Sequence, residues 1–257
     1  MRASGRIHGA TLLSLVVITR NEADRIERCI RSAPMAIEAV VLDCGSTDDT
    51  VSRAQSAGAR VEQTDWPGFV VQKNRAWAAA RQPWVLSLDA DECLSEAAAR
   101  ELTALLADPG DWVGMSFERR TSWLGYPLRY GRWGRDRKVR VGRRDRGRWQ
   151  GTDPHDHLVL DGPVLHSRAT IDHDPYRSIE EHLATVASYA TLSGEALARQ
   201  GIVATPWRVA VRPLFHLVDA IVFRQGWRDG VPGIAVAWVG AAHVALKWAS
   251  VWARRKR

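Results

Sequence analysis

The feature of this sequence that most constrains its fold is a regular alternation, over the first hundred residues, of apolar β-branched runs with segments of helical spacing. The strand-like runs are 14–19, 39–43, 59–63 and 84–89. The segments with helical spacing or helix-capping residues are 21–33, 46–58, 72–82 and 95–108. Strands separated by helices of about 10 to 15 residues are typical of βαβ units. The sequence therefore predicts an α/β fold in which helices cover a mainly parallel sheet.

The pattern changes after this region. Short strand-like pieces follow at 113–120, 138–144 and 157–162. These pieces predict an antiparallel extension, which would make the sheet mixed, and helical spacing returns from about Ile179. We expect one α/β domain over residues 1–205 and a C-terminal helical segment over 206–257.

The cysteines and the first apolar run bear on the compartment. Cys29, Cys44 and Cys93 are odd in number and form no CxxC pair. This argues against a disulfide framework or a zinc ribbon and fits a reducing compartment, so we expect a cytoplasmic location. The apolar run 12–18 contains Ser14 and leads into a polar loop. We therefore expect a buried strand there rather than a signal peptide.

The positive charge is concentrated in one segment. Residues 119–148 contain twelve arginines and lysines but only two acids, and tryptophans and tyrosines lie between the basic residues. A concentrated basic patch attracts phosphates, whether of a nucleotide, a nucleic acid or an anionic lipid. The alternative is an ordinary solvated face.

The last fifty residues are rich in tryptophan and poor in acids. Two amphipathic helices are expected at 207–227 and 231–257, and the region holds five of the twelve tryptophans. The nearly continuous apolar run 231–246 is shorter than the roughly 20 residues that span a bilayer. We expect these helices to lie in the interface of an anionic membrane leaflet. The alternatives are a helical pair packed on the protein's own core and a true transmembrane helix.

The stretch LSLDADE places Asp89 and Asp91 in a turn after an apolar strand. Mg²⁺ and Mn²⁺ prefer oxygen ligands and need only one or two protein carboxylates when a bound phosphate supplies further oxygens. The two aspartates could therefore hold a divalent metal against a nucleotide diphosphate. An acidic turn with no ligand is the alternative.

Four motifs in order carry a resemblance to a known family. They are VVITRNE, VLDCGSTDDT, QKN and LSLDADE, between residues 12 and 95. This series resembles the inverting family 2 glycosyltransferases, which have the Rossmann-like GT-A fold of nucleotide-diphospho-sugar transferases. Further motifs resemble the bacterial subgroup that builds lipopolysaccharide core. These are GRWGRDRKVRVGRR (131–144), PHDHLVLDG (154–162), LH (165–166) and DG (229–230).

The resemblance implies a donor site at the strand ends. The residues that match positions lining the nucleotide-sugar pocket are Thr19, Asn21, Glu22, Asp43, Lys73, Asn74 and Asp89. Asp43 would contact the nucleoside, although Cys44 stands where many members have a second acid. Asp91 and Asp89 match the metal motif for Mg²⁺ or Mn²⁺. Asp91 is expected as the direct ligand, and Asp89 as a contact to the ribose or to a metal-bound water.

The resemblance places the acceptor-side chemistry in the second half. An inverting transfer needs a base that takes the proton of the acceptor hydroxyl. Asp156 is the first candidate for this base and Asp153 the second. His155 would orient the acceptor or a phosphate, or would be a structural histidine. The candidates for holding phosphates are Arg135, Arg137, Lys138 and Arg140, since arginine forks match phosphate oxygens.

The function that this resemblance implies is transfer of a hexose or heptose from a nucleotide sugar, with a UDP-sugar as the expected donor. The acceptor would be a lipid-linked saccharide in lipopolysaccharide core or related cell-envelope synthesis. The enzyme would work as a peripheral protein on the inner face of the cytoplasmic membrane. One alternative is a polyprenyl-phosphate glycosyltransferase. Another is a non-enzymatic nucleic-acid-binding protein, which would leave the acidic clusters unexplained, so no nucleic acid is expected as partner.

Overall fold

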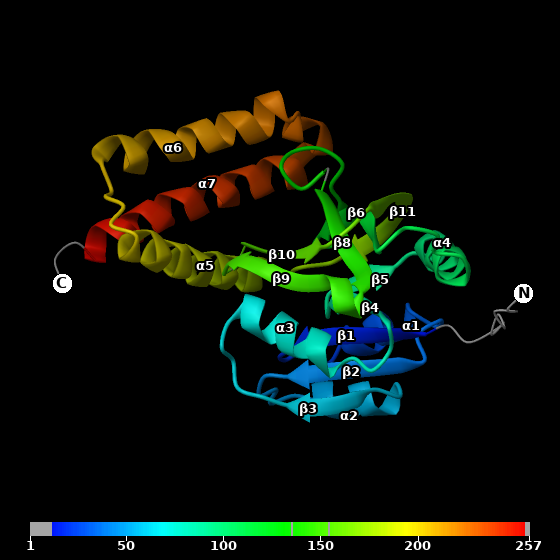
Figure 1. Ribbon diagram of the computed structural model, residues 1–257. Helices are drawn as coiled ribbons and strands as arrows, with labels where there is room; N and C mark the ends of the chain where they lie inside the picture. The colour runs from blue at the N-terminus through cyan, green and yellow to red at the C-terminus, as the bar shows by residue number, and fades with distance from the viewer. Residues whose placement is uncertain (1–11, 135, 154, 255–257) are drawn as a thin grey trace, which may run out of the picture. The chain divides into compact units, whose positions relative to one another are not determined.

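A sheet built around a buried first strand forms the frame of the N-terminal part. The computed structural model describes residues 12–134, 136–153 and 155–254 (Figure 1). All seven residues of β1 (Leu13–Thr19) are buried. This strand pairs in parallel with β2 (Glu38–Asp43) on one side and with β4 (Trp84–Asp89) on the other, and β3 (Arg60–Gln63) pairs in parallel with β2. The predicted parallel βαβ region is therefore present.

The sheet continues as an antiparallel extension. Its full order is β3-β2-β1-β4-β8-β6-β11-β5, and β7 pairs with β6. The added strands are β5 (Glu92–Leu94), β6 (Gly114–Trp123), β7 (Tyr126–Pro127), β8 (Asp136–Arg143) and β11 (Val164–His173). β8 is antiparallel to β4. After the short helix η1 (Arg144–Arg146), strands β9 (Gly147–Thr152) and β10 (His155–Leu160) form a separate two-stranded sheet, the β9–β10 hairpin. The predicted mixed, mainly parallel sheet is confirmed.

Helices cover both faces of the parallel strands. They are α1 (Ile26–Arg31), α2 (Thr50–Ser56), α3 (Phe69–Ala79) and α4 (Glu96–Ala107). Alternate residues of a strand point to opposite faces of a sheet. Accordingly, Leu15 and Val17 pack in the core that contains Ile26 of α1, whereas Val16 packs in a second core with Trp77 of α3. Two separate hydrophobic layers therefore hold the sheet.

The helix boundaries differ from the predicted ones at their N-terminal ends. The helical segments expected from residues 21 and 46 begin at Ile26 and Thr50. The polar residues before each helix form loops that bond to one another instead of joining the helix. By contrast, α4 begins where its cap predicts, because the Ser95 side chain accepts a hydrogen bond from the Ala98 amide at 3.2 Å.

The chain divides into two compact units. The first comprises residues 1–118, 137–151 and 156–171, and the second comprises 119–136, 152–155 and 172–257. The second unit holds α5 (Ile179–Arg199), α6 (Pro206–Val218), η2 (Asp219–Phe223), η3 (Gly226–Asp229) and α7 (Gly230–Ala253). Within it, α7 packs against both α5 and α6 (Figure 1). The predicted C-terminal helical segment 206–257 belongs to this unit.

The helices of the second unit leave much apolar surface exposed. None of the residues of α6 is buried, and Trp207 and Phe215 are each 67% exposed. Among the described residues, one helical stretch, Gly226–Ala253, is long and apolar enough to cross a membrane, and 22% of its most apolar window is buried. Many core helices of soluble proteins meet the same criterion of length and composition.

Candidate active site

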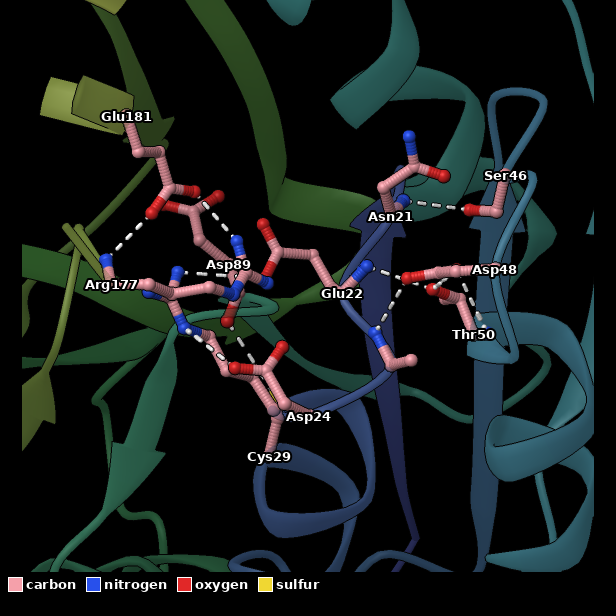
Figure 2. Close-up of polar contacts among 12 residues, drawn as sticks. Asn21, Glu22, Asp24, Cys29, Ser46, Asp48, Thr50, Asp89, Arg177 and Glu181 are labelled. Atoms are coloured by element: carbon pink, nitrogen blue, oxygen red, sulfur yellow. Dashed lines mark hydrogen bonds and ion pairs between the residues drawn. The ribbon is translucent and has the colours of Figure 1, made fainter. Parts of the chain in front are cut away.

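The loops that follow β1 and β2 are bonded to each other. Asn21 adopts a left-handed conformation with φ of 57°, and its amide donates to the Ser46 hydroxyl at 2.8 Å (Figure 2). Its side-chain oxygen accepts from the Thr47 amide at 2.8 Å. The Glu22 amide donates to the Thr50 hydroxyl at 2.7 Å (Figure 2). The predicted pocket residues Asn21 and Glu22 therefore help to fix the loop at the carboxyl end of the parallel strands.

Asp43 and Thr19 lie at the base of these loops. Asp43 is fully buried, and its Oδ2 accepts from the amides of Gly45 at 3.1 Å and Ser46 at 3.0 Å. Its Oδ1 accepts from the Ser46 hydroxyl. The carboxylate thus shapes its own loop, and its predicted contact with the nucleoside stays a prediction. Thr19 is buried beside this loop, and the part of the chain that the structure describes provides no hydrogen-bond partner for its hydroxyl.

A row of buried charges centres on Lys73. Its ammonium lies 2.8 Å from Oδ1 of Asp89 and 2.8 Å from Oδ2 of Asp156. The side chain of Lys73 is 6% exposed and that of Asp156 is 10% exposed. Charged groups withdrawn from water in this way are costly unless they are paired. Each of these three predicted site residues therefore depends on the others for its place in the fold.

Arg140 extends the row to Glu92. Its guanidinium donates to Oδ2 of Asp89 at 2.7 Å and to Oε1 of Glu92 at 2.5 Å. Burial lowers the pKa of Arg140, but the charges of Glu92 and Asp89 outweigh it, and the pKa is raised above its ordinary value. Arg140 is therefore a permanent cation at the carboxyl end of β4.

Glu92 and Cys29 hold the acidic turn in place. Glu92 is fully buried, and its Oε2 accepts from the Asp89 amide at 3.2 Å. The Cys29 thiol donates to the Asp89 carbonyl at 3.5 Å (Figure 2). Burial raises the pKa of Cys29 well above its usual value, which keeps it a neutral thiol. These contacts fix the backbone of Asp89 and with it the start of the DADE turn.

An aromatic ring covers the two cations. Lys73 Nζ lies 4.4 Å and the Arg140 guanidinium carbon 5.7 Å from the ring centroid of Trp149. Asn74 fixes this residue, because its side-chain nitrogen donates to the Trp149 carbonyl at 2.9 Å and its oxygen accepts from the Trp149 amide at 3.0 Å. Asn74 is predicted to contact the sugar nucleotide, but its amide here anchors β9.

The acidic turn suits a metal held by a single protein carboxylate. Both oxygens of Asp89 already contact cations. Asp91, two residues on, is half-buried and has a buried Oδ1. Among the described residues no group of three His, Cys, Asp or Glu side chains could form a metal cage. Magnesium bound with one carboxylate, waters and substrate phosphate needs no such cage, so Asp91 fits the predicted role as direct ligand better than Asp89.

The acceptor-side candidates fall in different units. Asp156 belongs to the first unit, whereas Asp153 and His155 belong to the second. Oδ2 of Asp156 contacts Lys73, and its Oδ1 has no hydrogen-bond partner in the described part of the chain. His155 is exposed and lines a cavity of the second unit. Of these candidates, Asp156 is the one that contacts a residue predicted for the donor side.

The other predicted phosphate-binding residues lie apart from this row. Arg137 donates to the Ser167 carbonyl at 2.8 Å and the Ser116 carbonyl at 3.2 Å, and it pairs with Glu118. Its guanidinium therefore ties β6, β8 and β11 together. Lys138 is half-buried on β8, and Arg135 lies outside the described residues.

The sequence matches a known protein family and a relative that covers most of the chain. The sequence profile of Glycosyl transferase family 2 matches residues 14–159. The chain belongs to glycosyltransferase family 2. The lipopolysaccharide core biosynthesis glycosyltransferase LpsC of Rhizobium meliloti is 30% identical to it over 250 residues, which cover 94% of this chain and 92% of that protein. The predicted family, and the predicted similarity to a lipopolysaccharide core enzyme, are confirmed.

Other matches cover less of the chain or are more distant. An uncharacterized glycosyltransferase of Rickettsia bellii is 44% identical over 96 residues, which are 37% of this chain and 33% of that protein. The crystal structure of glucosyl-3-phosphoglycerate synthase from Mycobacterium tuberculosis with Mg²⁺ and uridine-diphosphate is 21% identical. The superposition with this synthase covers 74% of the present chain and 79% of the synthase chain, with a TM-score of 0.46.

The residues that sequence reasoning missed are Glu92 and Trp149. Glu92 stands in the apolar strand ECL, where a lone acid that is fully buried must have a cationic partner. A lone acid in an apolar strand directly after the acidic turn is the sequence signal that points to Glu92. Trp149 directly follows the basic segment 119–148, but no spacing in the sequence relates it to Lys73.

Proposed function

We propose that this family 2 glycosyltransferase moves a hexose or heptose, with inversion, from a UDP-sugar to a lipid-linked saccharide of lipopolysaccharide core or a related envelope glycan. The similarity to LpsC over 94% of the chain supports the class of product. The observation that carries the proposal is the row of ion pairs from Asp156 through Lys73 to Asp89. It links a candidate base to the acidic turn at the carboxyl end of β4.

The donor side is assigned to the acidic turn and its two cations. Asp91 would hold Mg²⁺ or Mn²⁺, which neutralises charge on the departing diphosphate when it is bound. Lys73 and Arg140 lie on either side of Asp89 and supply positive charge that is already ordered before the donor arrives. Charge that is preorganised in a buried site stabilises a developing anion more than charge in water does. Asp89 therefore serves to position both cations.

The acceptor side is assigned to Asp156. An inverting transfer is a single displacement in which the acceptor oxygen attacks the anomeric carbon and loses its proton to a base. Oδ1 of Asp156 is the oxygen available for this proton, because Oδ2 contacts Lys73. The single ammonium of Lys73 would then hold the base in place and, by its contact with Asp89, also the acidic turn on the donor side. Asp153 remains the second candidate.

The second unit supports attachment to the membrane surface. Large exposed apolar side chains on α6, η2, η3 and α7 include Trp207, Phe215, Val222, Phe223, Trp227, Val231 and Trp238. A surface of this kind, with arginines nearby, is typical of helices lying in an anionic interface. A peripheral position fits better than a crossing α7, because the polar side chains His243 and Lys247 of this helix would be costly inside a bilayer.

Internal ion pairs account for much of the basic segment. Arg119 pairs with Asp136, Arg120 with Asp172 at 2.7 Å, and Arg132 with Asp219. These arginines are therefore less available to a polyanion than the charge count suggests. This supports leaving nucleic acid out as a partner.

The proposal is tested by the stereochemistry of the product. Purified protein is incubated with Mn²⁺, a panel of UDP-sugars and truncated lipopolysaccharide from strains that lack outer core sugars. The anomeric proton coupling of the product is then read by NMR. Transfer from an α-linked donor should give a β-linked product. A product that retains the donor configuration would contradict the inverting mechanism, and no transfer with any sugar would contradict the assigned acceptor class.

A further inference from the structure

The second unit contains a cavity of about 390 Å³ that the proposed reaction has not used. It is bounded by α5, α6, α7 and the loop at residues 128–133, and we call it the second-unit cavity. The side chains on which the argument rests are Trp133, Tyr176, His182, His216, His243 and Lys247. A cavity of this size, with aromatic walls and a few polar groups, is typical of a small-molecule site.

One wall of the cavity is an aromatic platform. Tyr176 stacks on His182 with ring centroids 4.0 Å apart and an interplanar angle of 21°. Trp133 lies 6.1 Å from Tyr176 and 5.6 Å from His182 between ring centroids. Flat apolar surfaces of this kind pack against the carbon-bound hydrogens on the face of a ligand ring.

His182 is held in one tautomer by its neighbour. The Trp123 indole nitrogen can only donate, and it lies 3.1 Å from Nδ1 of His182. The imidazole proton is therefore on Nε2. Burial lowers the pKa of His182 to about 4, so the ring is neutral at physiological pH. A neutral Nε2–H group can donate to a ligand oxygen without adding charge.

The other histidines add little charge. Burial, followed by the charge of Arg132, lowers the pKa of His216 to about 4. Burial and the charge of Lys247 lower the pKa of His243. A Cβ atom at Gly240 would lie 2.6 Å from Nε2 of His216, so this ring would have to shift to accommodate a larger residue there. The histidines thus provide neutral polar groups.

Among the described residues, Lys247 has no counter-ion in the cavity. Its ammonium makes no ion pair or hydrogen bond with any residue that the structure describes. Burial, together with the charge of Arg212, lowers its pKa. By contrast, the nearby Arg132 is paired with Asp219. A half-buried cation without a partner costs free energy, and an anion that enters the cavity would remove this cost.

The loop that carries Tyr130 and Trp133 is fixed by Asp229. Its Oδ2 accepts from the amides of Arg129 at 3.0 Å and Tyr130 at 2.8 Å. Asp229 of the DG motif therefore has a structural role, because it holds the loop that carries Tyr130 and Trp133. A wall fixed by backbone hydrogen bonds is preformed before a ligand binds, which favours a rigid ligand over a flexible chain.

We propose, resting on the proposed function, that the second-unit cavity binds an acidic sugar of the acceptor, with Lys247 pairing its carboxylate or phosphate and the Trp133, Tyr176 and His182 platform packing on its ring. The combination of one unpaired cation, ring-shaped apolar surface and neutral donors matches this ligand. A hydrocarbon chain would leave Lys247 unpaired, and free phosphate would leave the platform empty.

The first test needs no glycosyl transfer. Glucuronate, glucose 6-phosphate, glucose and inorganic phosphate are titrated into the full-length protein by calorimetry. A charge-assisted hydrogen bond implies that at least one acidic sugar should bind about tenfold or more tighter than glucose and than inorganic phosphate. Tighter binding of glucuronate would identify a carboxylate as the acidic group of the ligand, and tighter binding of glucose 6-phosphate would identify a phosphate. Glucose binding as tightly as both acidic sugars would overturn the proposal.

The second test uses matched variants. Lys247→Met should weaken binding of the acidic sugar about tenfold or more, whereas Lys247→Arg should keep most of it. Thermal unfolding and UDP binding with Mn²⁺ show that each variant is folded and that the donor site is intact. Equal binding by Lys247→Met and the wild type would overturn the proposal. If the wild type binds the acidic sugar but transfers no sugar to any acceptor, that result would instead count against the proposed function alone.

Discussion

Nζ of Lys73 lies 2.8 Å from Oδ2 of Asp156, at the point where β10 meets α3 of the first unit. The same ammonium contacts Asp89, which begins the acidic turn. One lysine therefore holds both the carboxylate proposed for the donor side and the carboxylate proposed for the acceptor side. The two substrates of a transferase must meet at one point, and we propose that this pair of contacts marks it.

Removing the Lys73 charge should damage both the fold and the reaction. In Lys73→Met, two largely buried carboxylates lose their shared cation, and breaking such a pair costs about 3–5 kcal/mol. The free energy of unfolding is measured by urea denaturation. Arg75→Met is the matched control on the same helix, since Arg75 is exposed and pairs with the exposed Asp65. That variant should lose about 1 kcal/mol or less. Equal losses in the two variants would contradict the buried network.

Asp156→Asn should separate binding from turnover. Loss of a general base lowers kcat about 10²- to 10⁴-fold. The affinity for UDP with Mn²⁺ should stay within about twofold, because the acidic turn keeps Arg140 and Glu92. The measurements are kcat for transfer and calorimetric UDP binding. Asp153→Asn is the comparison, and it should keep most of kcat. The reverse result would assign the base to Asp153.

Stability should fall as the solution is acidified. Burial lowers the pKa of His182 to about 4 in the folded protein, below its ordinary value of 6.5. The unfolded chain therefore binds more protons between these values, so stability is full above about pH 6.5 and is lost as pH falls toward 4. One such histidine contributes at most about 1.4 kcal/mol per pH unit.

Replacing His182 should flatten this dependence. In His182→Gln, the side-chain oxygen can still accept from Trp123, so part of the local structure is kept. The slope of unfolding free energy against pH, between pH 7 and 5, should decrease relative to the wild type. His157→Gln, at an exposed position, is the control and should leave the slope unchanged. An unchanged slope in His182→Gln would show that the ring is not kept neutral by the fold.

Membrane attachment should depend on the exposed apolar side chains of the second unit. Phe215 is 67% exposed and Phe223 is 70% exposed. Burying a phenylalanine contributes about 1.5–3 kcal/mol, so Phe215→Ser with Phe223→Ser should lower partitioning into phosphatidylglycerol vesicles at least tenfold. Co-sedimentation measures the bound fraction. Trp112→Ser, on the exposed surface of the first unit, should leave it unchanged. Equal partitioning of all three proteins would contradict the proposed surface.

The parts of the fold that the sequence predicts are those with local causes. The strand over residues 84–89 follows from its apolar run, and α4 begins at the cap that Ser95 provides. The strand-end motifs could be expected to lie near one another, because the carboxyl ends of parallel strands share one edge of a sheet.

The remaining features depend on contacts between distant parts of the chain. The pairing of Lys73 with Asp156 needs the β9–β10 hairpin to pack on α3, and no local pattern encodes that packing. The roles of Asp43 and Asn74 in fixing loops are equally invisible, since the same side chains could serve a ligand. The second-unit cavity draws its lining from α5, α6, α7 and η2 and from residues near positions 130, 155 and 176. Such a site can be recognised only once the tertiary structure is known.

We propose that Asp91 holds the divalent metal that binds the donor diphosphate. Calorimetric titration of UDP, with and without Mn²⁺, tests it most directly in the wild type, in Asp91→Asn and in the control Asp161→Asn at an exposed position. We expect Mn²⁺ to tighten UDP binding at least tenfold in the wild type and in the control, and to have no effect in Asp91→Asn. The same gain from Mn²⁺ in all three proteins would contradict the claim.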